Sequence, residues 1–164
     1  MTNIKAIRLL YRATRDGFTH SAFHSKCDGK ANTITIVKNN LNYVFGGYAS
    51  KAWHSKGAHI EDGNAFIFSL RRNGSSTNEK YKVTKPLYAY YGEPSSSGWL
   101  FCFGHVHDIV VKANSNTETG SYTNFGDSYQ LAEGYTYYTA GAKNYLSGNH
   151  NSWLTTEIEV FQLE

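Results

Sequence analysis

The stretch YVFGGYASKAW, residues 43–53, is the most informative part of this 164-residue chain for its fold. It predicts an aromatic strand that enters a pair of glycines, with a tryptophan just beyond. Upstream, TITIVK at residues 33–38 alternates strictly and is β-branched, which is the pattern of a strand. Asn39-Asn40 forms a turn signal between the two stretches, so we expect them to form an antiparallel hairpin.

The next stretch, NAFIFSL at residues 64–70, predicts a strand that is apolar on both faces. Phe66, Phe68 and Leu70 share one face, and Ala65 and Ile67 share the other. A strand with two apolar faces is typically buried on both sides. We therefore expect other parts of the protein to cover both faces of this strand.

Turn signals and short strands recur along the rest of the chain. Further strands are predicted at 80–83, 87–91, 99–103, 108–112 and 156–163, with loops at 73–78, 94–98 and 114–119 and surface excursions at 133–151. Thr19 is a suitable N-cap for a short helix that ends near Asp28-Gly29. The pattern favours a mainly β (α+β) fold: one domain, residues 1–164, with two antiparallel sheets in a sandwich and a few short edge helices.

Composition excludes several functional classes. The chain is 40% hydrophobic, 18% charged and 15% aromatic, with a net charge of +3. A charge this small, without a basic stripe, argues against nucleic-acid binding. No apolar run approaches the roughly 18 residues that span a bilayer, and the first residues lack a signal peptide. We expect a protein that is cytoplasmic or secreted by an unconventional route, with Cys27 and Cys102 reduced and buried rather than paired.

The usual catalytic and nucleotide-binding motifs are absent from the sequence. His105-Val106-His107-Asp108 is the best metal-like cluster: on a strand, both imidazoles would project from one face and could share a divalent cation. The alternative is two surface histidines beside a loop, with Asp108 bonded to a backbone amide. No cofactor is otherwise indicated.

Two further pairs could support catalysis but have simpler explanations. Glu157 and Glu159 share a face of the last strand, where two carboxylates could act as an acid/base pair, yet a catalytic pair normally spans a cleft. The simpler alternative is that they meet a cation or backbone amides and lock the terminal strand. Cys27 and His24 lie one helical turn apart, where side chains touch without any chemistry. We expect no enzyme.

The three tryptophans point toward ligand binding. Trp53, Trp99 and Trp153 each lie at the edge of a predicted strand beside polar residues. An indole face can stack on the C–H patch of a sugar while Asn, Asp or His side chains read its hydroxyls. The alternative is core packing, where most tryptophans are found.

Many short motifs, in order, resemble the TLDc domain over nearly the whole chain. They are LLYRA (9–13), RDGF (15–18), FH (23–24), KCDG (26–29), TITI (33–36), VFGGY (44–48) with Trp53, NAFIFSL (64–70), FG (103–104), HDI (107–109), SY (121–122) with Gly126, SY (128–129) and EIEVF (157–161). The resemblance implies a sandwich of two antiparallel sheets. It also implies a link to oxidation resistance, for several members through the vacuolar proton pump, and a scaffold role for Glu157 or Glu159.

The chain also looks like small stand-alone invertebrate TLDc proteins, some of which are lectins for galactose-type glycans. Departures from the family pattern, at WLFC (99–102), HV (105–106) and GNHNSW (148–153), add indole, imidazole and amide groups. We expect a non-catalytic, homo-oligomeric lectin without membrane insertion. The expected ligand-binding residues are Trp99, His105, His107, Asp108, Asn151 and Trp153, with Trp53 in reserve. The alternative is an intracellular oxidative-stress protein that acts on protein partners, including the vacuolar proton pump. The third hypothesis for the function is a hydrolase or a redox enzyme.

Overall fold

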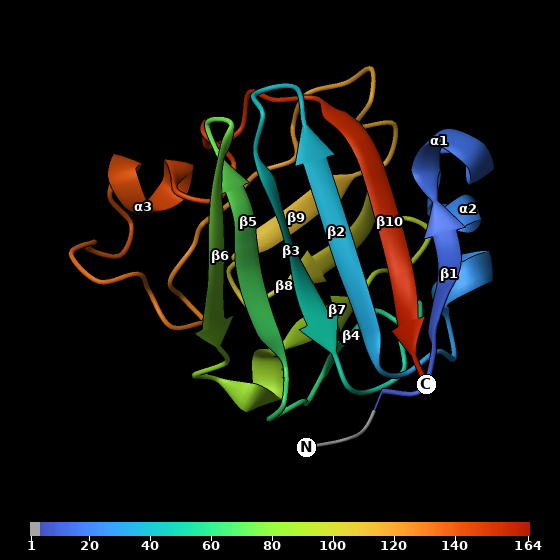
Figure 1. Cartoon of the computed structure of the whole chain (residues 1–164). Helices are drawn as coiled ribbons and strands as arrows, with labels where there is room; N and C mark the ends of the chain where they lie inside the picture. The colour runs from blue at the N-terminus through green and yellow to red at the C-terminus, as the bar shows by residue number, and fades with distance from the viewer. Residues whose placement is uncertain (1–3) are drawn as a thin grey trace.

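The computed structural model describes residues 4–164, which form two antiparallel β-sheets with short helices at their edges (Figure 1). In chain order the elements are β1 (Ile7–Arg12), α1 (Ala13–Asp16), α2 (His20–Cys27), β2 (Thr33–Asn39), β3 (Val44–Ala49), β4 (Ala58–Ile60), β5 (Phe66–Arg72), β6 (Ser75–Lys82), the 3-10 helix η1 (Pro86–Tyr88), β7 (Tyr90–Gly92), β8 (Trp99–Phe103), β9 (Ile109–Lys112), α3 (Ala140–Asn144) and β10 (Thr155–Leu163). The predicted fold class is confirmed.

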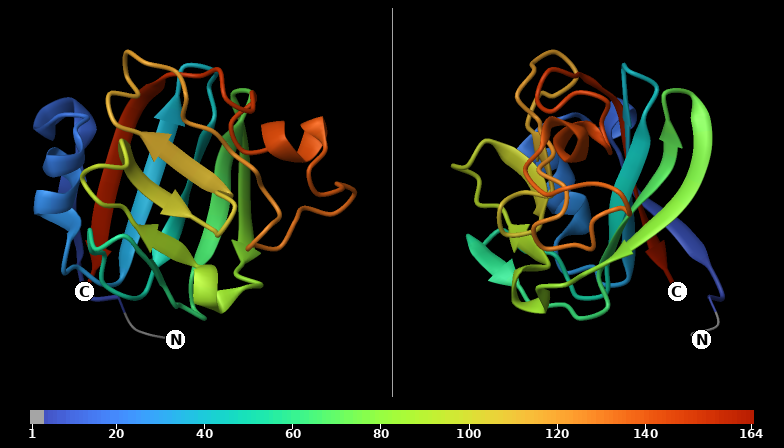
Figure 2. Two further views of the ribbon diagram at one scale, coloured as in Figure 1. Left: turned by 180° about the vertical axis from the view of Figure 1, so that it is seen from behind. Right: turned by 90° about the vertical axis from the view of Figure 1, so that its left-hand side faces the viewer.

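The larger sheet has the strand order β1-β10-β2-β3-β5-β6, and the smaller has β4-β7-β8-β9. The first and last strands of the chain pair with each other, so β10 lies between β1 and β2. The smaller sheet stacks behind the larger one, and its strands cross those of the larger sheet at an angle (Figure 2). The core fills the space between the two layers.

The hairpin and the first helix follow the sequence prediction. β2 and β3 pair antiparallel, with Thr33 opposite Ala49. α2 begins after Thr19, whose hydroxyl oxygen accepts a hydrogen bond from the backbone N–H of Ala22 at 3.2 Å. This is the bond that an N-cap threonine makes, and it explains why the helix begins there.

Two segments predicted as irregular contain regular structure. The loop expected at 73–78 is mostly β6, which begins directly after the Asn73-Gly74 turn. Both residues of this turn have positive φ. β6 is an edge strand whose outward residues are polar, so its sequence lacks the apolar alternation that marks a strand. The surface excursion expected at 133–151 contains α3, followed by the buried Leu146.

The glycine pair lets aromatic rings approach β3 from both sides. A Cβ at Gly47 would lie 2.5 Å from the ring of Phe103, which projects from β8 into the core. A Cβ at Gly46 would lie 1.9 Å from the backbone carbonyl oxygen of Thr35 on β2, and 2.9 Å from the ring of Phe68 on the opposite face of the large sheet. These distances are too short for a methyl group, so only glycine fits at either position.

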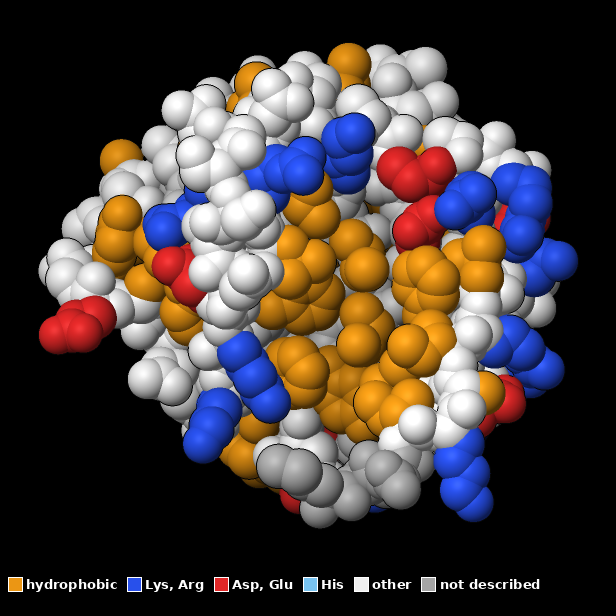
Figure 3. All heavy atoms as spheres, in the orientation of Figure 1, with side chains coloured by type: hydrophobic (Ala, Val, Ile, Leu, Met, Phe, Trp, Pro, Cys, Tyr) orange, Lys and Arg blue, Asp and Glu red, His pale blue; other side chains and the backbone are white. Residues whose placement is uncertain are grey.

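β5 is covered on one face only, which corrects the prediction that it is buried on both sides. Ile67 is fully buried in the core. On the other face Phe68 lies over Gly46 and is 7% exposed, but Phe66 is half-buried and Leu70 is 37% exposed. Figure 3 shows apolar side chains gathered over this outer face of the large sheet. Within residues 4–164, no helix or loop lies over it.

Replacing Gly47 with alanine is expected to destabilise the protein by about 1–3 kcal/mol, the usual cost of overpacking a core. The added methyl group would force the Phe103 ring, and with it β8, away from the large sheet. Urea denaturation of wild type and variant measures the difference. Gly63→Ala is the control, because a Cβ there meets no atom within 4 Å. Equal stability of the two variants would contradict the proposed packing.

Candidate functional site

A pocket of about 300 Å³ opens on the outer face of the small sheet, opposite the core. It is lined by His59, Tyr91, Glu93, Pro94, Ser97, Trp99, His105 and His107. His59 of β4 stands directly opposite Tyr91 of β7 in the antiparallel register. Trp99 begins β8, and the two other histidines belong to the turn after β8. The small sheet therefore brings together residues that are almost fifty positions apart.

Aromatic rings pack closely along one side of the pocket. The ring centroid of His59 lies 4.8 Å from that of Tyr91 and 5.2 Å from that of His105. The ring centroid of Tyr88, in η1, lies 5.0 Å from that of His59 and 4.5 Å from that of His105. The Nδ1 atom of His59 is buried and has no hydrogen-bond partner within residues 4–164. The wall is thus apolar in its ring faces but retains one unsatisfied polar atom.

The other side of the pocket is held by Tyr122. Its ring lies edge-on to that of Trp99, with centroids 5.8 Å apart, and its hydroxyl bonds Nδ1 of His107. The backbone of His107 has φ of 63°, a left-handed conformation that few non-glycine residues adopt. The hydrogen bond to Tyr122 therefore fixes the orientation of the His107 ring, and the tight turn fixes its backbone.

Asp108 supports this turn from beneath. It is fully buried, and its carboxylate accepts hydrogen bonds from the backbone N–H groups of Gly126, Asp127 and Ser128 at 2.8–3.1 Å. Burial raises the pKa of Asp108 to about 7, although these three donors favour the charged form. Gly104 is required opposite it, because a Cβ there would lie 2.0 Å from an Asp108 carboxylate oxygen.

The electrostatics of the pocket favour neutral imidazoles. Burial lowers the pKa of His59 and of His107, and the nearby His105 lowers both further. Burial also raises the pKa of the Glu93 carboxyl, which lies at the pocket wall. Neutral imidazoles each offer one donor and one acceptor, so the pocket can exchange hydrogen bonds with uncharged hydroxyl groups.

The structure divides the six predicted ligand-binding residues into three groups. Trp99, His105 and His107 line one pocket. Asp108 and Trp153 are buried, the first beneath the turn and the second in the core, where its ring centroid lies 5.7 Å from that of Phe45. Asn151 is exposed and does not line the pocket. Trp53, held in reserve, is also buried in the core, and its indole N–H donates to the Thr33 hydroxyl.

Several pocket residues could not be identified from the sequence. β4 has only three residues, too few to show a strand pattern around His59. Tyr91 lies in the short strand β7 and Glu93 directly follows it, and β7 comes after a 3-10 helix where the sequence predicted one continuous strand. Of the two alternatives for His105–Asp108, the structure has the loop and not the strand, because Gly104 and His107 both adopt positive φ. Asp108 bonds backbone amides, as that alternative predicted.

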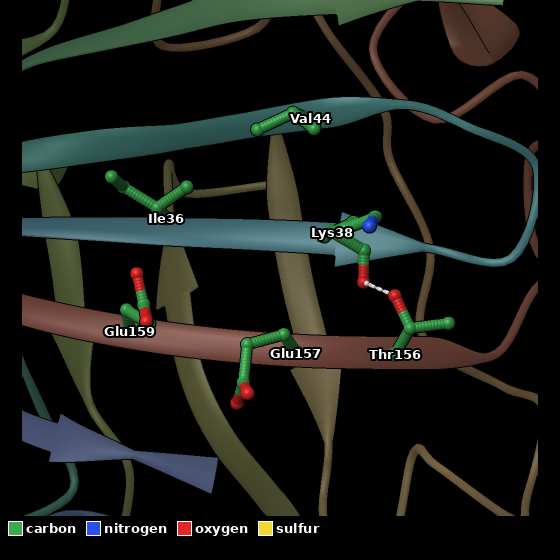
Figure 4. Close-up of a pocket in the computed structure, with 6 residues that line it drawn as sticks. All are labelled: Ile36, Lys38, Val44, Thr156, Glu157 and Glu159. Carbon is green, nitrogen blue, oxygen red and sulfur yellow. Dashed lines mark hydrogen bonds between the residues drawn. The ribbon is translucent and has the colours of Figure 1, made fainter. Parts of the chain in front are cut away.

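The other candidate clusters have structural partners. Glu159 pairs with Arg12, and the Glu157 carboxylate accepts a hydrogen bond from the Thr14 backbone N–H at 3.0 Å. Both contacts tie β10 to the first strand and helix, as the simpler reading of this pair predicted. Figure 4 shows the two carboxylates side by side on β10, with Lys38 on the neighbouring strand.

Within residues 4–164, no group of three or more His, Cys, Asp or Glu side chains is arranged to hold a metal ion. Cys27 and Cys102 are both buried and unpaired, as expected from the sequence. In the same part of the chain, no helix is both long enough and apolar enough to cross a bilayer.

Comparison with known proteins identifies a relationship along the whole chain. A family model described as the TLDc domain matches residues 2–164. The chain is also similar to MTOR-associated protein MEAK7 of Danio rerio, with 29% identity over 63 residues. The matched stretch is 38% of this chain and 14% of that relative, so the chain spans only a small part of the relative's length.

Acidification should destabilise the protein in part through His107. Because its pKa is lowered by folding, the folded state resists protonation, and the stability present above about pH 6.5 is lost as the pH falls below that value. His107→Asn removes the titrating group, and asparagine tolerates positive φ. Urea denaturation at pH 7 and pH 5 should show a smaller pH-dependent loss in the variant. The same loss in both proteins would contradict this assignment.

Proposed function

The chain belongs to the TLDc domain family, and on that premise we propose that it is a non-catalytic lectin for galactose-type glycans. The observation that carries the proposal is the convergence of Trp99, His105 and His107 in one open pocket on the small sheet. These three residues were singled out from the sequence for their sugar-binding chemistry, and they come from a strand and a separate turn. Small-ligand sites commonly combine aromatic walls with a few polar groups in this way.

The pocket supplies each kind of contact that a neutral sugar needs. Trp99 is half-buried, so part of its indole remains available to the C–H face of a pyranose ring. The neutral imidazoles of His59 and His107 can exchange hydrogen bonds with sugar hydroxyls. The unpaired Nδ1 of His59 would gain its missing partner from such a hydroxyl.

The proposed mode of binding is weak at each site and needs no metal ion. The pocket is open and shallow, and a single shallow site gives low affinity, so useful binding needs several sites on one oligomer. A cation held by His105 and His107 would need further ligands from the sugar itself to complete a coordination shell, so the proposal includes none.

A second candidate function is protein interaction in oxidative-stress protection, including binding to the vacuolar proton pump. The observation that favours it is the similarity to a relative whose name describes association with MTOR. This function requires an exposed surface and no pocket. Co-purification of pump subunits with the chain, unaffected by changes in the pocket, would support it over the lectin proposal.

A glycan-array screen of the purified chain, run with and without a chelator, tests the proposal. We expect selective binding to galactose-terminated glycans that is unchanged by the chelator. Loss of binding with the chelator would instead assign a cation to the two turn histidines. An array without binding in either condition would overturn the lectin proposal.

Trp99→Leu is expected to weaken glycan binding at least about tenfold, because an aliphatic side chain retains bulk but offers no ring for stacking. Isothermal titration with the best array glycan measures the change. Tyr138→Ala is the matched control, since Tyr138 is an exposed aromatic residue outside the pocket. Equal weakening in the two variants would show that the pocket is not the binding site.

A further inference from the structure

One acidic side chain lies in the pocket of the small sheet, where the other lining residues are aromatic rings and imidazoles, a proline and a serine. This residue, Glu93, is 2% exposed. It forms no ion pair with a lysine, arginine or histidine within residues 4–164. Buried carboxylates are normally paired with a cation, because burial removes the water that solvates the charge. Glu93 is therefore a buried acid whose cationic partner the described chain does not supply.

The strand register places Glu93 on the pocket side of the small sheet. Side chains alternate along an extended chain, so Glu93 points to the same face as Tyr91, two residues earlier. Tyr91 stands opposite Cys102 of β8, whose thiol is fully buried. Burial raises the pKa of the Cys102 thiol and of the Tyr122 hydroxyl, and the nearby charge of Glu93 raises both further. The carboxyl group is therefore close to both side chains, at the base of the pocket.

A tight turn holds Glu93 and Trp99 at its two ends. The backbone carbonyl oxygen of Pro94 accepts a hydrogen bond from the N–H of Ser97 at 3.0 Å, which closes the turn. The Ser97 hydroxyl oxygen then accepts a hydrogen bond from the N–H of Trp99 at 3.1 Å. On the other side, Nε2 of His20 donates to the backbone carbonyl oxygen of Glu93 at 2.8 Å. Both ends of the turn are thus fixed by the fold before any ligand binds.

The surroundings of Glu93 favour a positively charged ligand. Burial raises the pKa of its carboxyl group, whereas the Ser97 hydroxyl and His20 act in the opposite direction. The charged form is therefore costly in the pocket, although two neighbours support it. An ammonium group beside the carboxylate offsets this cost, because opposite charges attract strongly where water is excluded. A sugar hydroxyl offsets less of it, since it donates a hydrogen bond but carries no charge.

The rest of the pocket does not oppose an ammonium group. Burial lowers the pKa of His59 and of His107, so both imidazoles are uncharged at neutral pH. Within residues 4–164, no lysine or arginine lines the pocket. The half-buried indole of Trp99 offers a ring face, and ammonium groups are attracted to such faces. A buried carboxylate and an indole in one pocket form a combination that suits a protonated amine.

We propose that the pocket selects glycans that carry a free amino group, with Glu93 as the residue that binds the ammonium. The inference rests on the proposed lectin function and names its ligand class: galactosamine-type residues, in preference to galactose or N-acetylgalactosamine. Acetylation converts the amine to an uncharged amide, which cannot form an ion pair with Glu93. Glu93 is then the specificity-determining residue, while Trp99 and the imidazoles supply the contacts that all three sugars share.

An NMR titration of the intact chain with three methyl glycosides at pH 7 tests the preference. The glycosides are those of galactosamine, galactose and N-acetylgalactosamine. We expect the galactosamine glycoside to bind at least about tenfold more tightly than the other two, because a charge-assisted hydrogen bond is stronger than a neutral one. This comparison uses the wild-type chain alone, so it does not depend on the folding of a variant.

Glu93→Gln tests the role assigned to this residue, because glutamine keeps the shape of the side chain and removes its charge. The three glycosides should then bind within about twofold of one another, since none of them meets a charged group. Glu133→Gln is the matched control: Glu133 is exposed and outside the pocket, and the substitution makes the same change in net charge. This control should keep the full preference. Circular dichroism confirms that each variant is folded.

Four outcomes would overturn the proposal. Binding of the galactose glycoside without a preference for the amine would overturn it and leave the lectin proposal intact. A preference that persists in Glu93→Gln would show that another group binds the ammonium. Binding of ethanolamine as tightly as the galactosamine glycoside would show an amine site that does not read the sugar. Absence of binding for all three glycosides, together with an empty glycan array, would overturn both proposals.

Discussion

Two adjacent glycines of β3 determine how closely aromatic rings approach the two faces of the large sheet. Gly47 admits the ring of Phe103 on the inner face of β3, and Gly46 admits the ring of Phe68 on the outer face. The inner contact holds β8 against the large sheet and so places Trp99 and the following turn. The outer contact lets the Phe68 ring lie close against the exposed side of the sheet. A methyl group at Gly47 would displace the Phe103 ring, because core packing leaves no free volume. One at Gly46 would collide with the Thr35 carbonyl oxygen and with the Phe68 ring.

The pattern of β5 shows how a correct observation can lead to a wrong prediction. Phe66, Phe68 and Leu70 do alternate with core residues, and the apolar character of both faces is real. The domain covers only one of these faces, however, because the small sheet is the only second layer that residues 4–164 supply. The local sequence shows that a strand face is apolar. It does not show whether another part of the same chain packs against that face.

The β2–β3 hairpin, the capped helix α2, the closing strand and the family can be predicted from the sequence, because each depends on local periodicity, turn residues or an ordered set of motifs. The chemical suitability of Trp99, His105 and His107 for a ligand is also visible there. The burial of Trp153 and Asp108, and the convergence of those three residues in one pocket, depend on the tertiary structure. Strand pairing between distant segments places His59 beside them, and such pairing leaves no signal in a three-residue strand.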